Sequence, residues 1–165
     1  MVNSAAIPAV DKERLKRAGA KYSLICAGLG LLVAALITTA LFGVFTGSGL
    51  HQIILDPYFL APVAVAVSCL AIAAWYFGGL AGGVISRVGL ASPATRLIGI
   101  LLALHCMILS VTAGYLTHFF SSIHQSEMLY DYVAGPAIAV IGIGFVPALI
   151  LGLTFSAMIR SENRA

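Results

Sequence analysis

The sequence predicts an all-α membrane protein, a four-transmembrane-helix bundle with both termini in the cytoplasm. Hydrophobic residues make up 61% of the 165 residues and charged residues only 9%, whereas a soluble domain carries roughly 25% charged residues. Four apolar stretches are each long enough to cross a bilayer, which takes about 20 helical residues. The basic residues are also distributed unevenly among the segments that join these stretches.

A basic N-terminal segment, residues 1–21, precedes the first predicted span, residues 22–45. Glu13 and Arg17 are spaced i, i+4 in the stabilising order, so a short helix is expected before the membrane. The apolar run exceeds the roughly 7–15 residues of a signal-peptide core, so we expect a helix that remains in the membrane. The basic residues orient this span; contact with anionic lipid or a partner is their alternative role.

The second span is predicted over residues 59–86 and the third over residues 97–119, with a short loop between them. Ser92-Pro93 in this loop is a favourable start for the third helix. Near the end of the second span, two overlapping G-x-x-x-G pairs indicate close contact with another helix: Gly78 with Gly82, and Gly79 with Gly83.

The fourth span is predicted over residues 133–159 and is followed by a short tail, residues 160–165. Pro147 lies near its middle and predicts a kink around residues 144–147. Small residues recur at every fourth position of this span and predict a packing face: Gly144, Ala148, Gly152 and Ser156.

The third span carries the clearest row of small residues, with steps of four and three positions. Lipid tails are as apolar as leucine, so helices in a membrane gain from close backbone approach, which small side chains permit. This span is therefore expected to be the central packing helix. The row comprises Gly99, Ala103, Cys106, Ser110, Ala113 and Thr117.

The positive-inside rule places the N-terminal segment, the loop between the second and third spans and the C-terminal tail in the cytoplasm, because they hold all nine Lys and Arg residues. The other two loops carry Asp56, Glu127 and Asp131 and no basic residue. We therefore expect a multi-pass protein of the inner or plasma membrane, with the bilayer rather than nucleic acid as the partner of its positive charge.

His105 is the histidine inside the third apolar span, and His118 lies near the end of that span. A histidine facing lipid would leave polar nitrogens unsatisfied, so His105 is expected to face another helix or another subunit. A structural hydrogen bond is the simplest role, and no cofactor is then needed. Haem or quinone binding through His105 and His118, with further ligands from another chain, is the alternative.

The predicted loop between the third and fourth spans holds His124, Glu127 and Asp131, spaced i, i+3, i+7. If this loop is helical, the three side chains share one face, and imidazole and carboxylate are suitable ligands for zinc and similar cations. The polar face of an interfacial helix is the simpler interpretation.

The sequence contains no phosphate-binding loop, nucleophile elbow or zinc-protease motif, and none of the four predicted spans holds Asp, Glu, Lys or Arg. Catalysis by this chain alone is therefore not expected. Because four helices offer more small-residue faces than they need internally, the sequence favours a non-catalytic subunit of a larger membrane assembly, with other subunits or further copies of itself as partners. A homo-oligomeric channel or permease for a small solute is a second hypothesis, motivated by the proline-broken fourth span.

Overall fold

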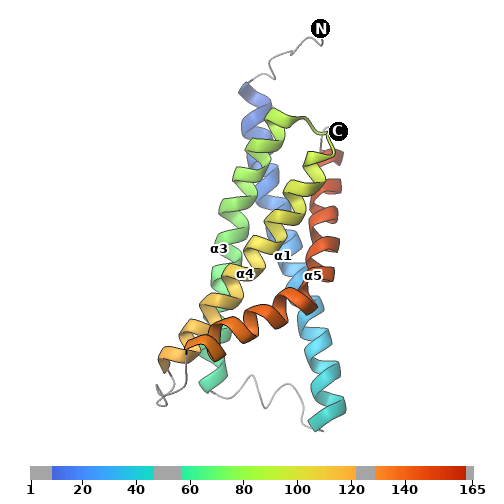
Figure 1. The fold of residues 1–165 in the computed structure, drawn as a ribbon. Helices are drawn as coiled ribbons and strands as arrows, with labels where there is room; N and C mark the ends of the chain where they lie inside the picture. Colours follow the sequence, from blue (N-terminus) through green and yellow to red (C-terminus); the bar gives the residue numbers. More distant parts are fainter. Residues whose placement is uncertain (1–8, 47–56, 122–128, 163–165) are drawn as a thin grey trace.

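The computed structural model describes residues 9–46, 57–121 and 129–162, with side chains described over residues 12–36, 60–120 and 144–162. Four α-helices follow one another in this part of the chain: α1 (Ala9–Thr46), α3 (Pro57–Val88), α4 (Ala94–Ser121) and α5 (Leu129–Ser161) (Figure 1). Helices that are consecutive in the chain pack against each other, and α5 returns to contact α1. The predicted all-helical fold is confirmed.

All four helices are long and apolar enough to cross a membrane, over Lys12–Leu36, Leu60–Val88, Ala94–Phe120 and Gly144–Ser161. Their outer faces carry large apolar side chains, among them Leu36, which is 62% exposed, and Ile72, which is 67% exposed. A soluble monomer does not expose apolar surface on this scale. These features support a multi-pass membrane protein.

The first helix begins before the predicted span and runs through most of the basic segment. Leu15 and Ala18 are buried in the bundle, whereas Glu13 and Arg17 are exposed. The described part of the basic segment is thus helical and continuous with the first span, with exposed charged residues on one side and an apolar stripe for packing on the other. The fourth helix likewise begins at Leu129, ahead of the predicted boundary.

A tight turn joins α3 to α4. Gly89 adopts a positive φ of 94° and its N–H donates to the carbonyl of Ile85 at 2.9 Å, which is the usual way for a glycine to end a helix. The hydroxyl of Ser92 then accepts the N–H of Ala94 at 3.2 Å and caps α4. This local chemistry holds α3 and α4 together as an antiparallel hairpin.

Helix α5 is bent (Figure 1). Its first part runs across the bundle, and its last part runs alongside α4 and α1. Proline lacks the N–H that would bond to the preceding turn, so Pro147 is the expected cause of the bend.

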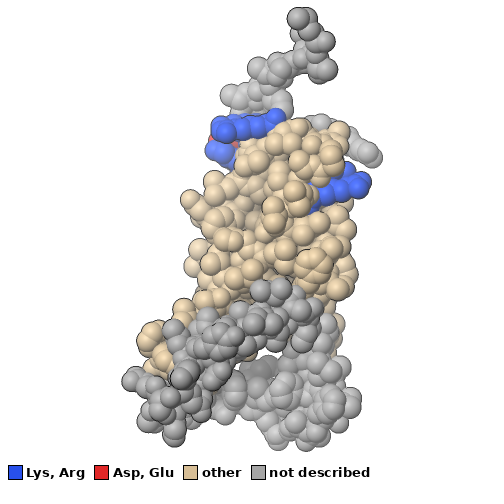
Figure 2. All heavy atoms as spheres, viewed as in Figure 1, with Lys and Arg blue, Asp and Glu red and all other residues tan. Residues whose placement is uncertain are grey.

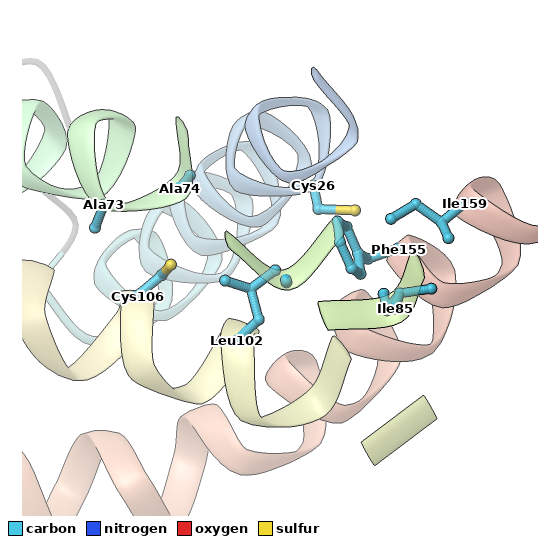
Figure 3. Close-up of a cluster of buried hydrophobic side chains, with 9 residues drawn as sticks. Cys26, Ala73, Ala74, Ile85, Leu102, Cys106, Phe155 and Ile159 are labelled. Carbon is cyan, nitrogen blue, oxygen red and sulfur yellow. The ribbon is translucent and has the colours of Figure 1, made fainter. Parts of the chain in front are cut away.

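The largest buried side chains lie toward one end of the bundle, where Ile85, Phe155 and Ile159 are at most 1% exposed and lie close together (Figure 3). Farther along, the core narrows to small residues such as Ala74 and Cys106. The size of the buried side chains therefore differs between the two parts of the core.

The Lys and Arg side chains that are visible lie at the end of the bundle where α1 and α4 begin and α3 and α5 end (Figure 2). We call this the basic end. Arg87 lies in the last turn of α3, Arg96 lies in the first turn of α4, and Arg160 lies in the last turn of α5. The antiparallel order of the helices thus gathers basic residues from distant parts of the sequence.

Candidate functional site

His105 lies on the outer surface of the α3–α4 pair. Its imidazole is exposed, and its ring meets the ring of Phe77 from α3 edge to face, with centroids 4.8 Å apart. Phe77 in turn meets Tyr76 edge to face at 5.2 Å. Tyr76, Phe77 and His105 therefore form a continuous aromatic strip, which we call the His105 face.

The depth of His105 follows from the sequence of α4. Residues 97–104 are all apolar and separate it from Arg96, so the imidazole lies about 13 Å farther along the helix axis than Arg96, at 1.5 Å per residue. A histidine side chain is too short to reach from this position to the level of Arg96 at the basic end. Within the described residues, His105 contacts Phe77 and forms no hydrogen bond.

The glycines of the two G-x-x-x-G pairs lie against α1. A Cβ at Gly78 would overlap Ser23, and one at Gly82 would overlap the carbonyl of Leu15 and lie 3.2 Å from the Cα of Lys16. Gly79 and Gly83 have more room, because their nearest neighbours, on Lys16, are at 3.7 and 3.5 Å. Only one glycine of each adjacent pair thus points directly at α1.

The partner of these glycines on α1 is Gly19, which the sequence analysis did not single out. A Cβ there would overlap the carbonyl of Gly78 and lie 3.1 Å from the Cα of Gly82. Gly19, Ser23 and Ala27 recur at every fourth position, which is the pattern that could have identified this face. The pattern starts inside the basic segment, where charged residues obscure it.

Helices α4 and α5 meet at Gly99 and Gly152. A Cβ at Gly152 would lie 2.6 Å from the backbone nitrogen of Ile100, and one at Gly99 would overlap the carbonyl of Gly152. The buried Ser156 hydroxyl lies beside this contact, 3.0 Å from the carbonyl of Thr95 and 2.8 Å from that of Gly152. Ala148, 2% exposed, is buried on the same helix.

The α3–α4 contact uses another part of the α4 row. Ser110 donates to the carbonyl of Ala66 at 2.7 Å, and Cys69 donates to the carbonyl of Leu109 at 3.7 Å. Gly114, absent from the predicted row, would meet Ala66 at 3.0 Å if it carried a Cβ. The α4 row therefore serves two neighbours, α5 near Gly99 and α3 near Ser110.

The remaining members of the predicted rows are less enclosed. Cys106 is buried, whereas Ala103, Ala113, Thr117 and Gly144 are partly exposed. Thr117 donates to the carbonyl of Ala113 in its own helix at 2.8 Å. The most buried small residues are thus occupied by helices of the same chain, and their number no longer provides a reason to expect a partner.

The predicted metal ligands are only partly visible. His124 and Glu127 lie outside the described residues, and only the backbone of Asp131, in α5, is described. His118 lies in the last turn of α4, about 20 Å along the helix axis from His105 at 1.5 Å per residue. The two histidines are therefore too far apart to bind one ligand together.

At the basic end, Glu162 connects α5 to α1. Arg14 lies 3.5 Å from the Glu162 carboxylate and donates to its backbone carbonyl at 3.2 Å, and the Tyr22 hydroxyl donates to the other carboxylate oxygen. The Tyr22 hydrogen bond, together with the charge of Arg14, holds the pKa of Glu162 below its usual value. Near the α3–α4 turn, Arg160 donates to the carbonyl of Ser92 at 3.0 Å.

Comparisons of the chain with models of known protein families, with curated proteins and with solved structures find no match.

Proposed function

We propose that this chain is a non-catalytic subunit of a membrane protein assembly and that it meets its partner through the His105 face. The observation that carries the proposal is the exposed imidazole of His105, which forms no hydrogen bond within the described residues. Leaving such a group in hydrocarbon is costly. A hydroxyl, amide or carbonyl of a second chain seated on this face would remove that cost.

The surroundings of His105 support a protein contact. Leu101, 56% exposed, and Ile108, 40% exposed, lie on the same side of α4 at i−4 and i+3. On α3, Tyr76 is 55% exposed and Leu80 is 49% exposed. Aromatic and aliphatic side chains around one polar group are typical of the centre of a protein interface.

The test compares His105→Leu with the wild-type chain by native mass spectrometry of the protein extracted in mild detergent, which reports partners and stoichiometry. Interhelical hydrogen bonds in membranes contribute about 0.6–1.7 kcal/mol, so the association constant should fall roughly threefold to twentyfold. His105→Gln retains a hydrogen-bonding group and should restore most of the association. Leu32→Ala removes an apolar side chain that is 58% exposed on α1 and should leave it unchanged.

Lipid contact predicts the opposite result. A leucine side chain has no polar group to bury in hydrocarbon, so His105→Leu would then leave association unchanged and would stabilise the chain. That result, or a wild-type chain that is extracted as a lone monomer, would contradict the proposal.

The same imidazole favours a second candidate, a subunit that holds haem or quinone between itself and a partner. Histidine is a common axial ligand of haem, an imidazole can form a hydrogen bond with a quinone oxygen, and the exposed ring of His105 is available for either role. For haem, the visible spectrum of the purified assembly distinguishes the cofactor-holding subunit from the subunit without a cofactor. A Soret band that His105→Leu abolishes supports the cofactor role, and no band excludes haem.

The proposal places the basic end in the cytoplasm, following the positive-inside rule. The start of α1 and the end of α5 both lie at that end (Figure 1). A fluorescent or phosphatase reporter fused after residue 165 tests this orientation. Fluorescence without phosphatase activity supports a cytoplasmic C-terminus. Phosphatase activity without fluorescence would reverse the orientation.

A further inference from the structure

A cavity of about 380 Å³ opens at the basic end between the start of α4 and the end of α5. Its lining combines polar or charged side chains with apolar ones. The polar or charged lining residues are Arg96, Ser156, Arg160 and Ser161, and the apolar ones are Leu153 and Ala157. The cavity therefore combines two guanidinium groups with the edge of the hydrocarbon-facing surface.

The two arginines have no carboxylate partner among the described residues, where the ion pairs are Arg14 with Glu162 and Lys16 with Glu13. Glu162 is close in sequence to Arg160 but is bound to α1 through Arg14 and Tyr22. Within the described residues, the positive charge of the cavity is thus not paired with a carboxylate.

Arg160 is held in place on one side only. One terminal nitrogen donates to the carbonyl of Ser92, whereas its buried Nε has no hydrogen-bond partner among the described residues. A buried donor without a partner is costly, and guanidinium groups bind phosphate oxygens through paired N–H donors. Arg160 lines the cavity, and hydrogen-bond partners among the described residues use only one of its terminal nitrogens, the one bound to Ser92, so its other N–H donors are left for an anionic ligand.

An apolar stripe on α5 leads from the cavity toward the middle of the bundle. Leu153 is 40% exposed, Ile150 58% and Val146 61%, and their spacing of three and four residues places them on the same side of the helix as Ala157. An acyl chain lying along this stripe would bring its head group to Arg96 and Arg160.

We propose that this cavity binds the phosphate head group of an anionic phospholipid, with an acyl chain along Val146, Ile150 and Leu153. The two arginines supply the charge, and the stripe supplies a surface that free phosphate cannot use. Basic pockets between transmembrane helices on the cytoplasmic side bind anionic head groups in this way. The inference is independent of the His105 face, which lies on the α3–α4 side of α4.

The experiment measures lipid retained by the full-length protein in detergent, using native mass spectrometry with added phosphatidylglycerol, phosphatidylcholine or inorganic phosphate. The wild-type chain should retain phosphatidylglycerol in preference to phosphatidylcholine. Each basic residue near the phosphate contributes about 1 kcal/mol, so Arg96→Gln should weaken retention about fivefold, and Arg96→Gln with Arg160→Gln by twentyfold or more. Arg87→Gln is the matched control, because Arg87 lies at the same end, is exposed and does not line the cavity.

Arg96→Gln decides the outcome, because the side chain of Arg96 forms no hydrogen bond among the described residues, whereas the side chain of Arg160 also supports the α3–α4 turn. Retention by Arg96→Gln equal to that of wild type would overturn the proposal, as would equal retention of phosphatidylcholine. Competition by inorganic phosphate that is as effective as competition by phosphatidylglycerol would assign the cavity to a free anion and overturn the proposal of a phospholipid. Val146→Asn provides an independent check and should weaken phosphatidylglycerol retention without changing any charge.

Discussion

The α1–α3 and α4–α5 contacts both place a glycine of one helix against the backbone of the next, but different interactions secure them. At Gly19 and Gly82 the helices are in direct backbone contact, with no room for a Cβ. At Gly99 and Gly152 the approach is as close, and Ser156 adds a hydrogen bond to the carbonyl of Thr95. The comparison shows that small residues set the distance between helices, while polar side chains fix their position along each other.

The largest effect is expected for Gly82→Leu, which breaks the α1–α3 contact. A side chain at this position would overlap the backbone of Leu15, and backbone cannot move aside as a flexible side chain can. We expect a loss of about 3 kcal/mol or more in the free energy of unfolding, measured by denaturant titration in detergent. Gly83→Ala is the matched control, because its new methyl group makes only an ordinary contact with Lys16 at 3.5 Å. Equal losses in both variants would show that α1 does not approach α3 through Gly82.

Gly152→Ala should have the next largest effect, because its methyl group would lie 2.5 Å from the Cα of Ile100. A loss of about 1–3 kcal/mol is expected in the same titration. Gly28→Ala introduces the same methyl group where nothing lies within 4 Å, and its stability should be unchanged or slightly higher. Gly99→Ala combined with Gly152→Ala should cost less than the sum of the two, because either change already separates the helices. Strict additivity would mean that the two glycines do not share one contact.

Ser156→Ala tests the polar part of the α4–α5 contact without changing the distance between the helices. The substitution removes the hydrogen bond to Thr95 and should cost about 0.6–1.7 kcal/mol. Thr154→Ala removes a hydroxyl that bonds only within its own helix, to the carbonyl of Ile150 at 2.9 Å, and should cost less. A larger loss for Thr154→Ala would show that hydroxyl groups stabilise α5 through bonds within the helix and not through the α4–α5 contact.

The smallest effect is expected for Glu162→Gln, which removes the ion pair between α5 and α1. The pKa of Glu162 is lowered in the folded state, chiefly by the Tyr22 hydrogen bond and then by Arg14. Its contribution to stability is therefore present above the pKa of the unfolded chain and is lost as the pH falls through the folded-state pKa. The unfolding midpoints of wild type and Glu162→Gln should differ slightly at neutral pH and converge in acid. Midpoints that diverge as the pH falls would contradict this assignment.

Composition and local chemistry were enough to predict the four helices and several of their ends. Apolar stretches longer than a bilayer have one compatible secondary structure, because every backbone polar group must be satisfied within the segment. The turn after α3 was also predictable from Ser92-Pro93, whose hydroxyl caps α4.

The pairing of helices was less predictable, because a row of small residues does not specify its partner. The α4 row contacts α5 at Gly99 and α3 at Ser110, and it continues to Gly114 instead of Ala113, because a period of 3.6 residues drifts from a regular alternation of three and four. Gly19 was missed because Lys16, Arg17 and Lys21 lie in the same turns of α1, and these charged residues hide the apolar stripe in the sequence pattern. The cavity at Arg96 and Arg160 depends on that pairing and has no signature in the sequence.

The contact between α4 and the end of α5 also has a consequence for biosynthesis. Thr95 and Gly99 acquire their neighbours from residues 152–156, which the ribosome adds more than fifty positions later. Until then, Gly99 and the carbonyl of Thr95 on the newly inserted α3–α4 hairpin are exposed to lipid or to any other segment nearby. The final helix therefore acts as a closing piece, and a translation product that lacks it presents the membrane quality-control machinery with an unfinished surface.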